Sequence, residues 1–597
     1  MALVKLETSQ LRPPRSPIFE VKQSELDSLA LLNTSYDIYC ELYERFLMVF
    51  NRFKQKKNRK KILIVQTKES SDHLNLIEDI IKNHLLNTSD YQEKSFDVVS
   101  KTHYAYNEGE FVYTEPLDTD NPIGFCPIHA TNWIEMPSLF GTVHQHGEQL
   151  KLSEGILQQL NGGYLVLTAG TLLSNPLMFI RLLKVLETGV FEWLSPDETK
   201  PYPIRIQSMP LDVKLLILAE RDNIDNLLAL EPYLQSMSCY TEIEPVLELT
   251  SHLDYNLWQS YINGISMRIT NALIDDSLWY ALHCFSTRFT GDQYELSLCP
   301  QFWTQTFYSL LAYIDKENTS SVSKAAFDEW QSEKQYCEGY LAQRIYTDFL
   351  KDQIYIDVEG KIVGQINGLA VLSYPGHPVE IGEPSRITCI VHLGDGEVND
   401  IERKVELGGN IHAKGLLIMQ AFLFSSLKLT QPFPLSASIV FEQSYSEVDG
   451  DSASLAELCA LISAIADVPI NQQIAITGSV DQFGQVQPIG GVNEKIEGFF
   501  AICLNRGLTK GQGVIIPESN IHHLSVNDEV LEAIEKGEFH LWTVNHVTEA
   551  IELLTSIKYC SEDDEMDLLT MMQQKILQSV DNETPEPWYR RIFNFSN

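Results

Sequence analysis

The chain has 597 residues, with 44 Lys and Arg against 81 Asp and Glu, which gives a formal net charge of −37. Such an excess of negative charge excludes non-specific binding to nucleic acid as a main function, because phosphates would be repelled. Hydrophobic residues make up 44% of the chain, which excludes wholesale disorder, and the length predicts about three to five domains at roughly 100 to 200 residues each.

The cysteines and the apolar segments indicate where the protein works. Ten cysteines are spread singly, with no C-x-x-C pair, a pattern typical of a reducing compartment and not of zinc sites. The first residues lack the basic and apolar regions of a secretory signal. The most apolar stretch, residues 163–183, is interrupted by Asn175, Pro176 and Arg181, so it falls short of the ~20 apolar residues of a membrane helix. We therefore expect a cytoplasmic protein without a membrane partner.

The first half of the chain predicts an α/β domain after a helical lead-in at residues 1–60. Apolar runs at Ile62–Gln66, Tyr164–Thr168 and Val213–Ala219 alternate with helical patterns. This alternation predicts a largely parallel sheet spanning residues 61–245.

The second half begins with mostly helical patterns at residues 246–340, which we expect to form a lid and connector. From 341 to 558, strands and glycine turns alternate with helices, which predicts a second, α+β domain. Residues 559–597 form an acidic tail with one amphipathic helix. The expected fold class is therefore a multidomain protein of α/β and α+β type.

The α/β domain lacks the motifs that bind and hydrolyse a nucleotide. A phosphate-binding loop has the form G-x-x-x-x-G-K-[ST], because bare backbone N–H groups must wrap the phosphates. The first glycine in the chain is Gly109, so the loop that follows Ile62–Gln66 contains none. The strand 164–168 is followed by Ala169 where a magnesium-binding pair of acids would be needed. We predict no ATP hydrolysis, no cofactor and no metal.

A serine stands out in the α+β domain. The segment Glu-Val-Asp-Gly-Asp-Ser-Ala-Ser at residues 447–454 follows an expected strand at 436–441 and opens an apolar helix at 455–466. Ser452 is therefore expected beside the positive end of a helix, where the turn residues Gly450, Asp451 and Ala453 offer backbone N–H groups to an oxyanion. Two structural roles remain open: Ser452 as a helix N-cap, or Ser454 and Glu457 as a capping box.

A nucleophilic serine needs a base, and no histidine occurs between residues 412 and 522. Lysine can serve if burial lowers its pKa by ~3 units, at a cost of ~4 kcal/mol. The candidate is Lys495. A turn at Gly490-Gly491 precedes an expected helix that begins near Asn493, and this helix places Lys495 in its first turn with apolar residues around the amine. Taken alone, a lysine early in a helix is more often solvated.

Together these two motifs resemble the proteolytic domain of Lon proteases. That family has an acidic-Gly-x-Ser-Ala-[Gly/Ser] motif and a lysine 43 residues later, after Pro-Ile-Gly-Gly; here 495 − 452 = 43. The resemblance implies that Ser452 is the nucleophile and Lys495 the general base. It also implies that Thr477 orients the lysine and that Asp449 organises the turn.

Residues 137–168 resemble the ATPase module of LonB and Lon-related proteases, which implies a degenerate AAA+-like domain. As a whole, the resemblance implies a Lon-like serine endopeptidase that cleaves unfolded or loosely folded polypeptides without ATP. It also implies a homo-oligomeric ring, a hexamer in this family.

Two other functions stay open. A Ser-His hydrolase would pair Ser452 with one of the downstream histidines, since Gly450-x-Ser452-x-Ser454 approaches the nucleophile-elbow pattern. The histidines in question are His522, His523, His540 and His546. A catalytically silent adaptor would keep the same architecture for binding alone.

Overall fold

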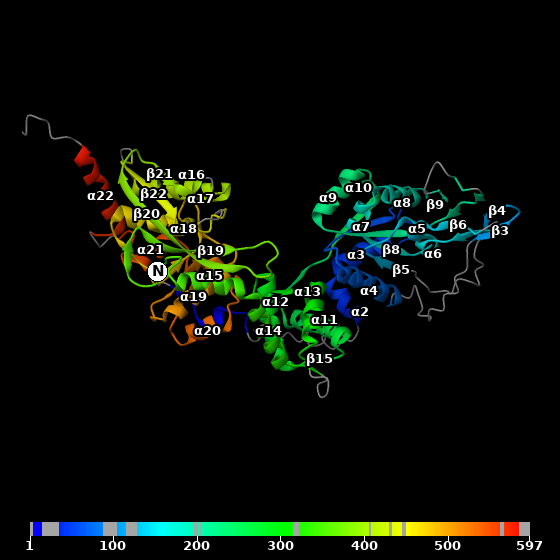
Figure 1. The fold of residues 1–597 in the computed structure, drawn as a ribbon, viewed down its shortest axis with the longest axis horizontal. Helices are drawn as coiled ribbons and strands as arrows, with labels where there is room; N and C mark the ends of the chain where they lie inside the picture. Colours follow the sequence, from blue (N-terminus) through cyan, green and yellow to red (C-terminus); the bar gives the residue numbers. More distant parts are fainter. Residues whose placement is uncertain are drawn as a thin grey trace, which may run out of the picture. The chain divides into compact units, whose positions relative to one another are not determined.

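The computed structural model describes residues 4–14, 35–55, 57–87, 104–114, 128–146, 149–195, 201–202, 204–314, 321–404, 407–428, 433–444, 449–561 and 566–583. The chain forms two compact units (Figure 1). The N-terminal unit comprises residues 17–279 and 296–327, and the C-terminal unit comprises 1–16, 280–295 and 328–597. Residues 246–340, expected as a lid and connector, therefore contribute to both units.

The N-terminal unit is built on a five-stranded, fully parallel sheet in the order β13-β2-β12-β8-β5. The strands span Ser238–Glu242, Ile62–Gln66, Lys214–Ala219, Tyr164–Thr168 and Ile128–Thr131, in that order. Every residue of β8 and β12 is buried, as expected where helices cover both faces of a parallel sheet. The three predicted apolar runs are therefore neighbouring central strands.

Local signals in the sequence set the ends of the helices in this unit. Helix α8 spans Pro176–Thr188: the Asn175 side chain caps it by accepting from the Met178 N–H at 3.1 Å, and Gly189 ends it in the left-handed conformation. The other helices around the sheet are α4 (Ser71–Asn87), α7 (Ala169–Ser174) and α9 (Arg221–Leu230). Helices α11 (His252–Thr270) and α13 (Pro300–Leu310) pack through Trp258 and Trp303, whose rings lie 5.8 Å apart.

The C-terminal unit contains a mixed eight-stranded sheet in the order β1-β28-β27-β24-β19-β20-β22-β21. Its strands are Val4–Lys5, His540–Val544, Gly513–Pro517, Ile474–Ile476, Gln365–Leu372, Ile381–Leu393, Leu435–Phe441 and Val398–Asp400, in that order. Helix α18 (Ser454–Ala466) is buried along nearly all its length and lies in the core between this sheet and helices α17 (Asn410–Leu427) and α22 (Leu568–Glu583). A parallel α/β unit and a mixed α+β unit confirm the predicted fold class.

Three local features of the C-terminal unit add to this description. Helix α17 begins at Asn410, so His412 lies in its first turn. The backbone leaves the sheet at Thr477 and Gly478, which separates β24 from the short strand β25 (Ser479–Val480). Helix α22 buries Leu568, Met572 and Ile576 in the core of the C-terminal unit. The rest of the tail, residues 584–597, lies outside the described residues.

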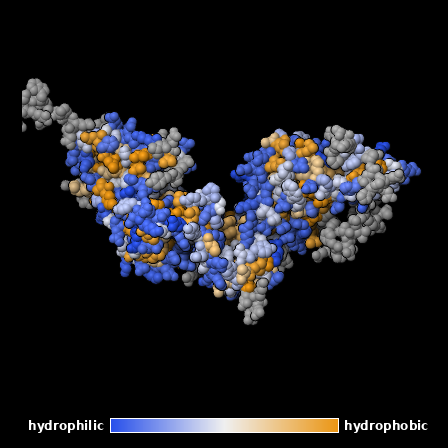
Figure 2. Space-filling view, in the orientation of Figure 1, coloured by the Kyte–Doolittle hydropathy of each residue, from blue (hydrophilic) through white to orange (hydrophobic). Residues whose placement is uncertain are grey.

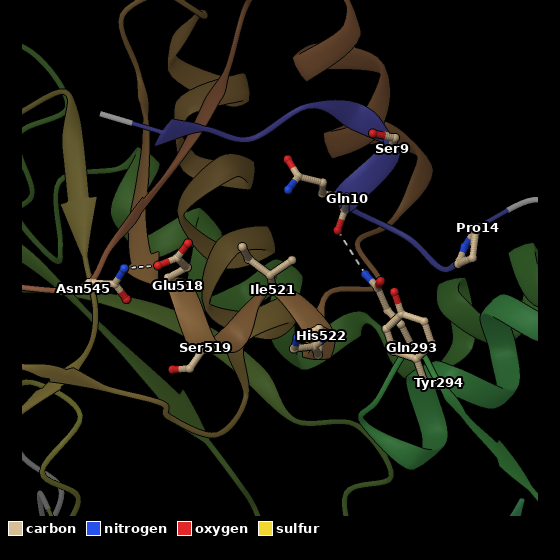
Figure 3. A pocket seen from close by; sticks show the side chains of 10 residues that line it. All are labelled: Ser9, Gln10, Pro14, Gln293, Tyr294, Glu518, Ser519, Ile521, His522 and Asn545. Carbon is tan, nitrogen blue, oxygen red and sulfur yellow. Dashed lines mark hydrogen bonds between the residues drawn. The ribbon is translucent and has the colours of Figure 1, made fainter. Parts of the chain in front are cut away.

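The N-terminal segment belongs to the C-terminal unit. Strand β1 pairs antiparallel with β28, with Val4 opposite Thr543. Leu6 and Leu11 are buried in the same core as β28. Figure 3 shows Gln10 joined through its carbonyl oxygen to the Gln293 amide, which donates to it at 3.0 Å. Residues from the start of the chain therefore complete a sheet formed mostly by its last third.

The surface of both units is polar with scattered apolar residues. Figure 2 shows hydrophilic residues over most of the visible face, with smaller hydrophobic areas on each unit. In the described part of the chain, no helix combines the length and the hydropathy that a membrane span requires.

Candidate active site

Ser452 lies in the turn between β22 and α18, and it does not cap the helix. The N-cap of α18 is Ala453, with no side-chain hydrogen bond. The capping-box alternative is also wrong: the Ser454 hydroxyl accepts from the Val480 N–H at 3.2 Å, and Glu457 is fully buried. The Ser452 hydroxyl therefore makes no hydrogen bond that caps the helix.

Lys495 comes to this serine from helix α19 (Val492–Arg506). The helix starts after Gly491, whose φ of +64° favours glycine. A side chain at that position would also place a Cβ only 2.6 Å from Val371. The Lys495 ammonium nitrogen lies 3.0 Å from Ser452 Oγ, and the lysine is only 3% exposed. The structure thus brings together two residues that are 43 positions apart in the sequence.

Thr477 links the two side chains. Its hydroxyl donates to the Ser452 carbonyl at 3.2 Å and accepts from Lys495 Nζ at 3.3 Å. The Gly478 N–H donates to the same carbonyl at 2.9 Å. The break between β24 and β25 therefore lets one short segment fix both the backbone of the serine and the end of the lysine.

The environment of Lys495 shifts its protonation. Burial lowers the pKa of this amine from 10.5 to about 8, and the negative charges of Asp451 and Glu494 partly oppose the shift. At that pKa roughly one amine in ten is neutral at pH 7, against fewer than one in a thousand at the ordinary value. A neutral amine at 3.0 Å from a hydroxyl oxygen is able to accept the hydroxyl proton.

The two acidic residues near the serine have different surroundings. Asp451 accepts from the Ser479 hydroxyl at 3.0 Å and acts electrostatically on Lys495. Asp449 instead packs against Gly409, at the start of α17. A Cβ added at Gly409 would lie only 2.0 Å from Asp449 Oδ1. Asp449, Gly450 and Ala453 line the same cleft as Ser452. Asp451 is thus the acid that acts electrostatically on Lys495, whereas the role of Asp449 in organising the turn stays a prediction.

The four downstream histidines have other partners. His523 contacts Asn520, His540 contacts the Lys510 carbonyl, and His546 contacts Thr548 and the Phe483 carbonyl. His522 packs its ring against Tyr294 at 5.6 Å between centroids. It lines a separate hollow of about 620 Å³ that also includes Gln10 and Gln293 (Figure 3). This arrangement favours Lys495 over these histidines as the base.

Sequence reasoning missed a buried ionisable cluster behind the serine turn. The His412 ring nitrogen lies 3.0 Å from Asp400 and 3.7 Å from Glu457 of α18, and all three side chains are buried. The hydrogen bond to Asp400 and the negative charges of Glu457 and Glu402 raise the pKa of His412 to about 9, although burial opposes this. His412 therefore ties α17 and β21 to the helix that carries the serine turn. The sequence offered one signal for this cluster: a histidine and a glutamate, each within an otherwise apolar helix.

In the N-terminal unit, a glutamate fills the position where a parallel sheet usually binds phosphate. Glu69 follows β2, and its carboxylate accepts from the Gly170 N–H at 2.7 Å, the Glu220 N–H at 3.2 Å and the Asn223 amide at 2.8 Å. Those groups follow β8 and β12 at the carboxyl edge of the sheet, where ligands bind in such folds. Backbone donors that would otherwise face an anion are thus bonded to the protein's own carboxylate.

Thr168, at the end of β8, caps helix α7, with its Oγ1 accepting from the Thr171 N–H. In the described ranges, no cluster of three or more His, Cys, Asp or Glu side chains is arranged to hold a metal ion.

Comparisons with known proteins agree with this architecture. Residues 443–556 match the family model of the Lon protease (S16) C-terminal proteolytic domain, and residues 126–238 match that of a LonB-like AAA domain. The chain is 39% identical over 568 residues to a protein of Escherichia coli named "Putative Lon protease homolog", covering 95% of each.

A protein of the same name from Haemophilus influenzae is 40% identical over 487 residues, or 80% of each chain. An archaeal Lon protease of Archaeoglobus fulgidus is 31% identical over 222 residues, which is 37% of this chain and 32% of the relative.

Proposed function

The chain belongs to the Lon protease family, and from that premise we propose that it is a serine endopeptidase in which Ser452 and Lys495 form the catalytic dyad. The observation that carries the proposal is the 3.0 Å separation of Ser452 Oγ and Lys495 Nζ, with the lysine 3% exposed. Its substrates would be unfolded or loosely folded polypeptides.

The geometry supports a two-step acyl transfer. Ser452 Oγ attacks the scissile carbonyl carbon while its proton passes to the neutral Lys495 amine. The Lys495 ammonium then gives that proton to the leaving amine as the peptide bond breaks, which leaves an ester on Ser452 and a neutral lysine. A water molecule, deprotonated by Lys495, hydrolyses the ester and regenerates the serine. Thr477 acts as a positioning residue, because it holds both partners by hydrogen bonds.

The proposal includes cleavage without ATP hydrolysis. What supports it is the bonding of Glu69 to the N–H groups of Gly170 and Glu220 at the sheet edge, together with a threonine at the end of β8. We also propose that the protein assembles into a homo-oligomeric ring, which the family resemblance suggests is a hexamer. A cytoplasmic location rests on the scattered cysteines, of which the nine described are free.

The test uses an unstructured casein substrate, with and without ATP and magnesium. Wild type is expected to cleave at equal rates in both conditions, and Ser452→Ala and Lys495→Gln are expected to lose cleavage. Matched controls are Ser332→Ala and Lys536→Gln at exposed positions, which should cleave like wild type. Cleavage that survives either dyad substitution contradicts the assignment, and a steep dependence on ATP contradicts the role given to the N-terminal unit.

A catalytically silent adaptor is the second candidate, and it predicts a different chemical result. A fluorophosphonate probe labels a serine only where a base activates it. Labelling of wild type but not of Lys495→Gln supports the enzyme. Absence of labelling in the assembled wild-type protein favours the adaptor.

A further inference from the structure

The cleft beside Ser452 has a strongly asymmetric charge. It has a volume of about 1020 Å³ and is lined by the end of β19, the start of β20, helix α15 (Tyr340–Leu350) and the turn at Gly490 and Gly491. Five carboxylates line it against two basic side chains. The acids are Asp348, Glu380, Glu383, Glu442 and Asp449, and the bases are Arg386 and Lys495.

Both basic side chains are already engaged. The Arg386 guanidinium lies 3.9 Å from the Glu442 carboxylate and stacks 4.8 Å over the ring of Tyr355. Lys495 is hydrogen-bonded to Ser452 and Thr477. Neither therefore neutralises the other acids of the cleft wall.

Glu383 is the acid for which this matters most. It lies on β20 opposite Ala370 of β19, and its neighbour Gly382 is held by Tyr346, whose hydroxyl donates to the Gly382 carbonyl at 3.1 Å. Among the described residues, no cation pairs with the Glu383 carboxylate. Burial alone raises the pKa of this acid, with no positive charge to lower it. A partly buried carboxylate without a cation beside it would be stabilised by a positive charge that enters the cleft.

The surroundings of Glu383 suit a long basic side chain. Ile345, Leu369 and Val371 give the same cleft an apolar wall. The aliphatic stem of lysine or arginine packs on such a wall while its charged end reaches a carboxylate. An apolar substrate residue would leave Glu383 desolvated and unpaired, and an acidic one would be repelled.

We propose that this cleft selects polypeptide segments that carry a lysine or arginine, with Glu383 as the ion-pair partner and Glu380 and Asp348 adding to the attraction. The inference rests on the proposed function, since it assigns the substrate preference of the Ser452 site. It makes Glu383 a specificity-determining residue and not a catalytic one.

Binding is measured first, on a Ser452→Ala background that cannot cleave. Fluorescent peptides share one scaffold and carry Lys, Arg, Gln, norleucine or Glu at one position, which is moved along the scaffold. Anisotropy titration is expected to give about tenfold tighter binding for Lys and Arg than for Gln or norleucine at one position. Adding Glu383→Gln should bring this ratio to within about twofold, whereas adding Glu359→Gln, an exposed acid outside the cleft, should leave it unchanged.

Equal affinities for basic and neutral peptides overturn the proposal, and so does a basic preference that survives Glu383→Gln. A preference that both glutamate substitutions reduce equally also overturns it, because that result indicates overall charge and not this cleft. Cleavage of the same peptides by wild type is scored separately. Basic peptides that bind through Glu383 but are not cut refute the proposed dyad and leave the specificity standing.

Discussion

The pKa of Lys495 gives the sharpest test of the proposed dyad. With a pKa of about 8, the neutral fraction of the amine rises from roughly one in eleven at pH 7 to roughly ten in eleven at pH 9. Acylation of Ser452 should therefore increase about tenfold over this interval and then reach a plateau. A lysine with the ordinary pKa would give about a hundredfold increase and no plateau below pH 10.

The assay is the second-order rate of Ser452 labelling by a fluorophosphonate from pH 6 to 10, with kcat/KM for a fluorogenic peptide measured in parallel. Asp451→Asn provides an internal check, because the charge of Asp451 holds the pKa of Lys495 up. Its removal should move the rising limb to lower pH. A rate that does not depend on pH, or one that still rises log-linearly at pH 10, would refute the description of a buried, partly neutral amine.

Three further predictions concern the framework around this amine. Lys495→Met should abolish activity, yet it should stabilise the C-terminal unit by about 1–3 kcal/mol at pH 7. The reason is that the pKa of Lys495 is lower in the folded protein, about 8, than in the unfolded chain, 10.5, so protonation of the amine favours unfolding. This cost is fully present below about pH 8 and disappears as the pH rises towards 10.5. Urea unfolding at pH 7 and pH 10 measures this, and equal stability of the two proteins at pH 7 would contradict it. Thr477→Val should lower kcat/KM about 10- to 100-fold, since it removes two buried hydrogen bonds, whereas Thr509→Val, at an exposed position, should not. Deletion of residues 1–14 should destabilise the C-terminal unit by about 3–6 kcal/mol, because Leu6 and Leu11 leave its core; a melting curve unchanged for that unit would show that the segment is dispensable.

Local patterns in the sequence predicted much of the fold and part of the candidate site. The runs Ile62–Gln66 and Tyr164–Thr168 are strands with the predicted bounds, because continuous apolar runs bounded by polar loops have few other ways to be buried. Ser452 and Lys495 were each singled out from a glycine turn before an expected helix, and the resemblance to Lon proteases added the 43-residue spacing.

Interactions that depend on tertiary packing were beyond such patterns. His412 and Glu457 are 45 residues apart and meet only because α17 and α18 pack together. Glu69 lies in a loop that the sequence identified only as lacking glycine, yet its carboxylate bonds to groups about 100 and 150 residues away. Thr477 interrupts an apolar strand pattern, and only the pairing of β24 with its neighbours determines where that strand stops.

The pairing of Val4 and Lys5 with β28 has a consequence for biosynthesis. The first strand leaves the ribosome long before its partner at residues 540–544 is made, and at about 5–20 residues per second this delay is roughly 30–100 s. Closing so large a loop is also entropically late in folding. The eight-stranded sheet is therefore completed only after residues 540–544 have been made, and β1 waits for its partner strand throughout the synthesis of the residues between them.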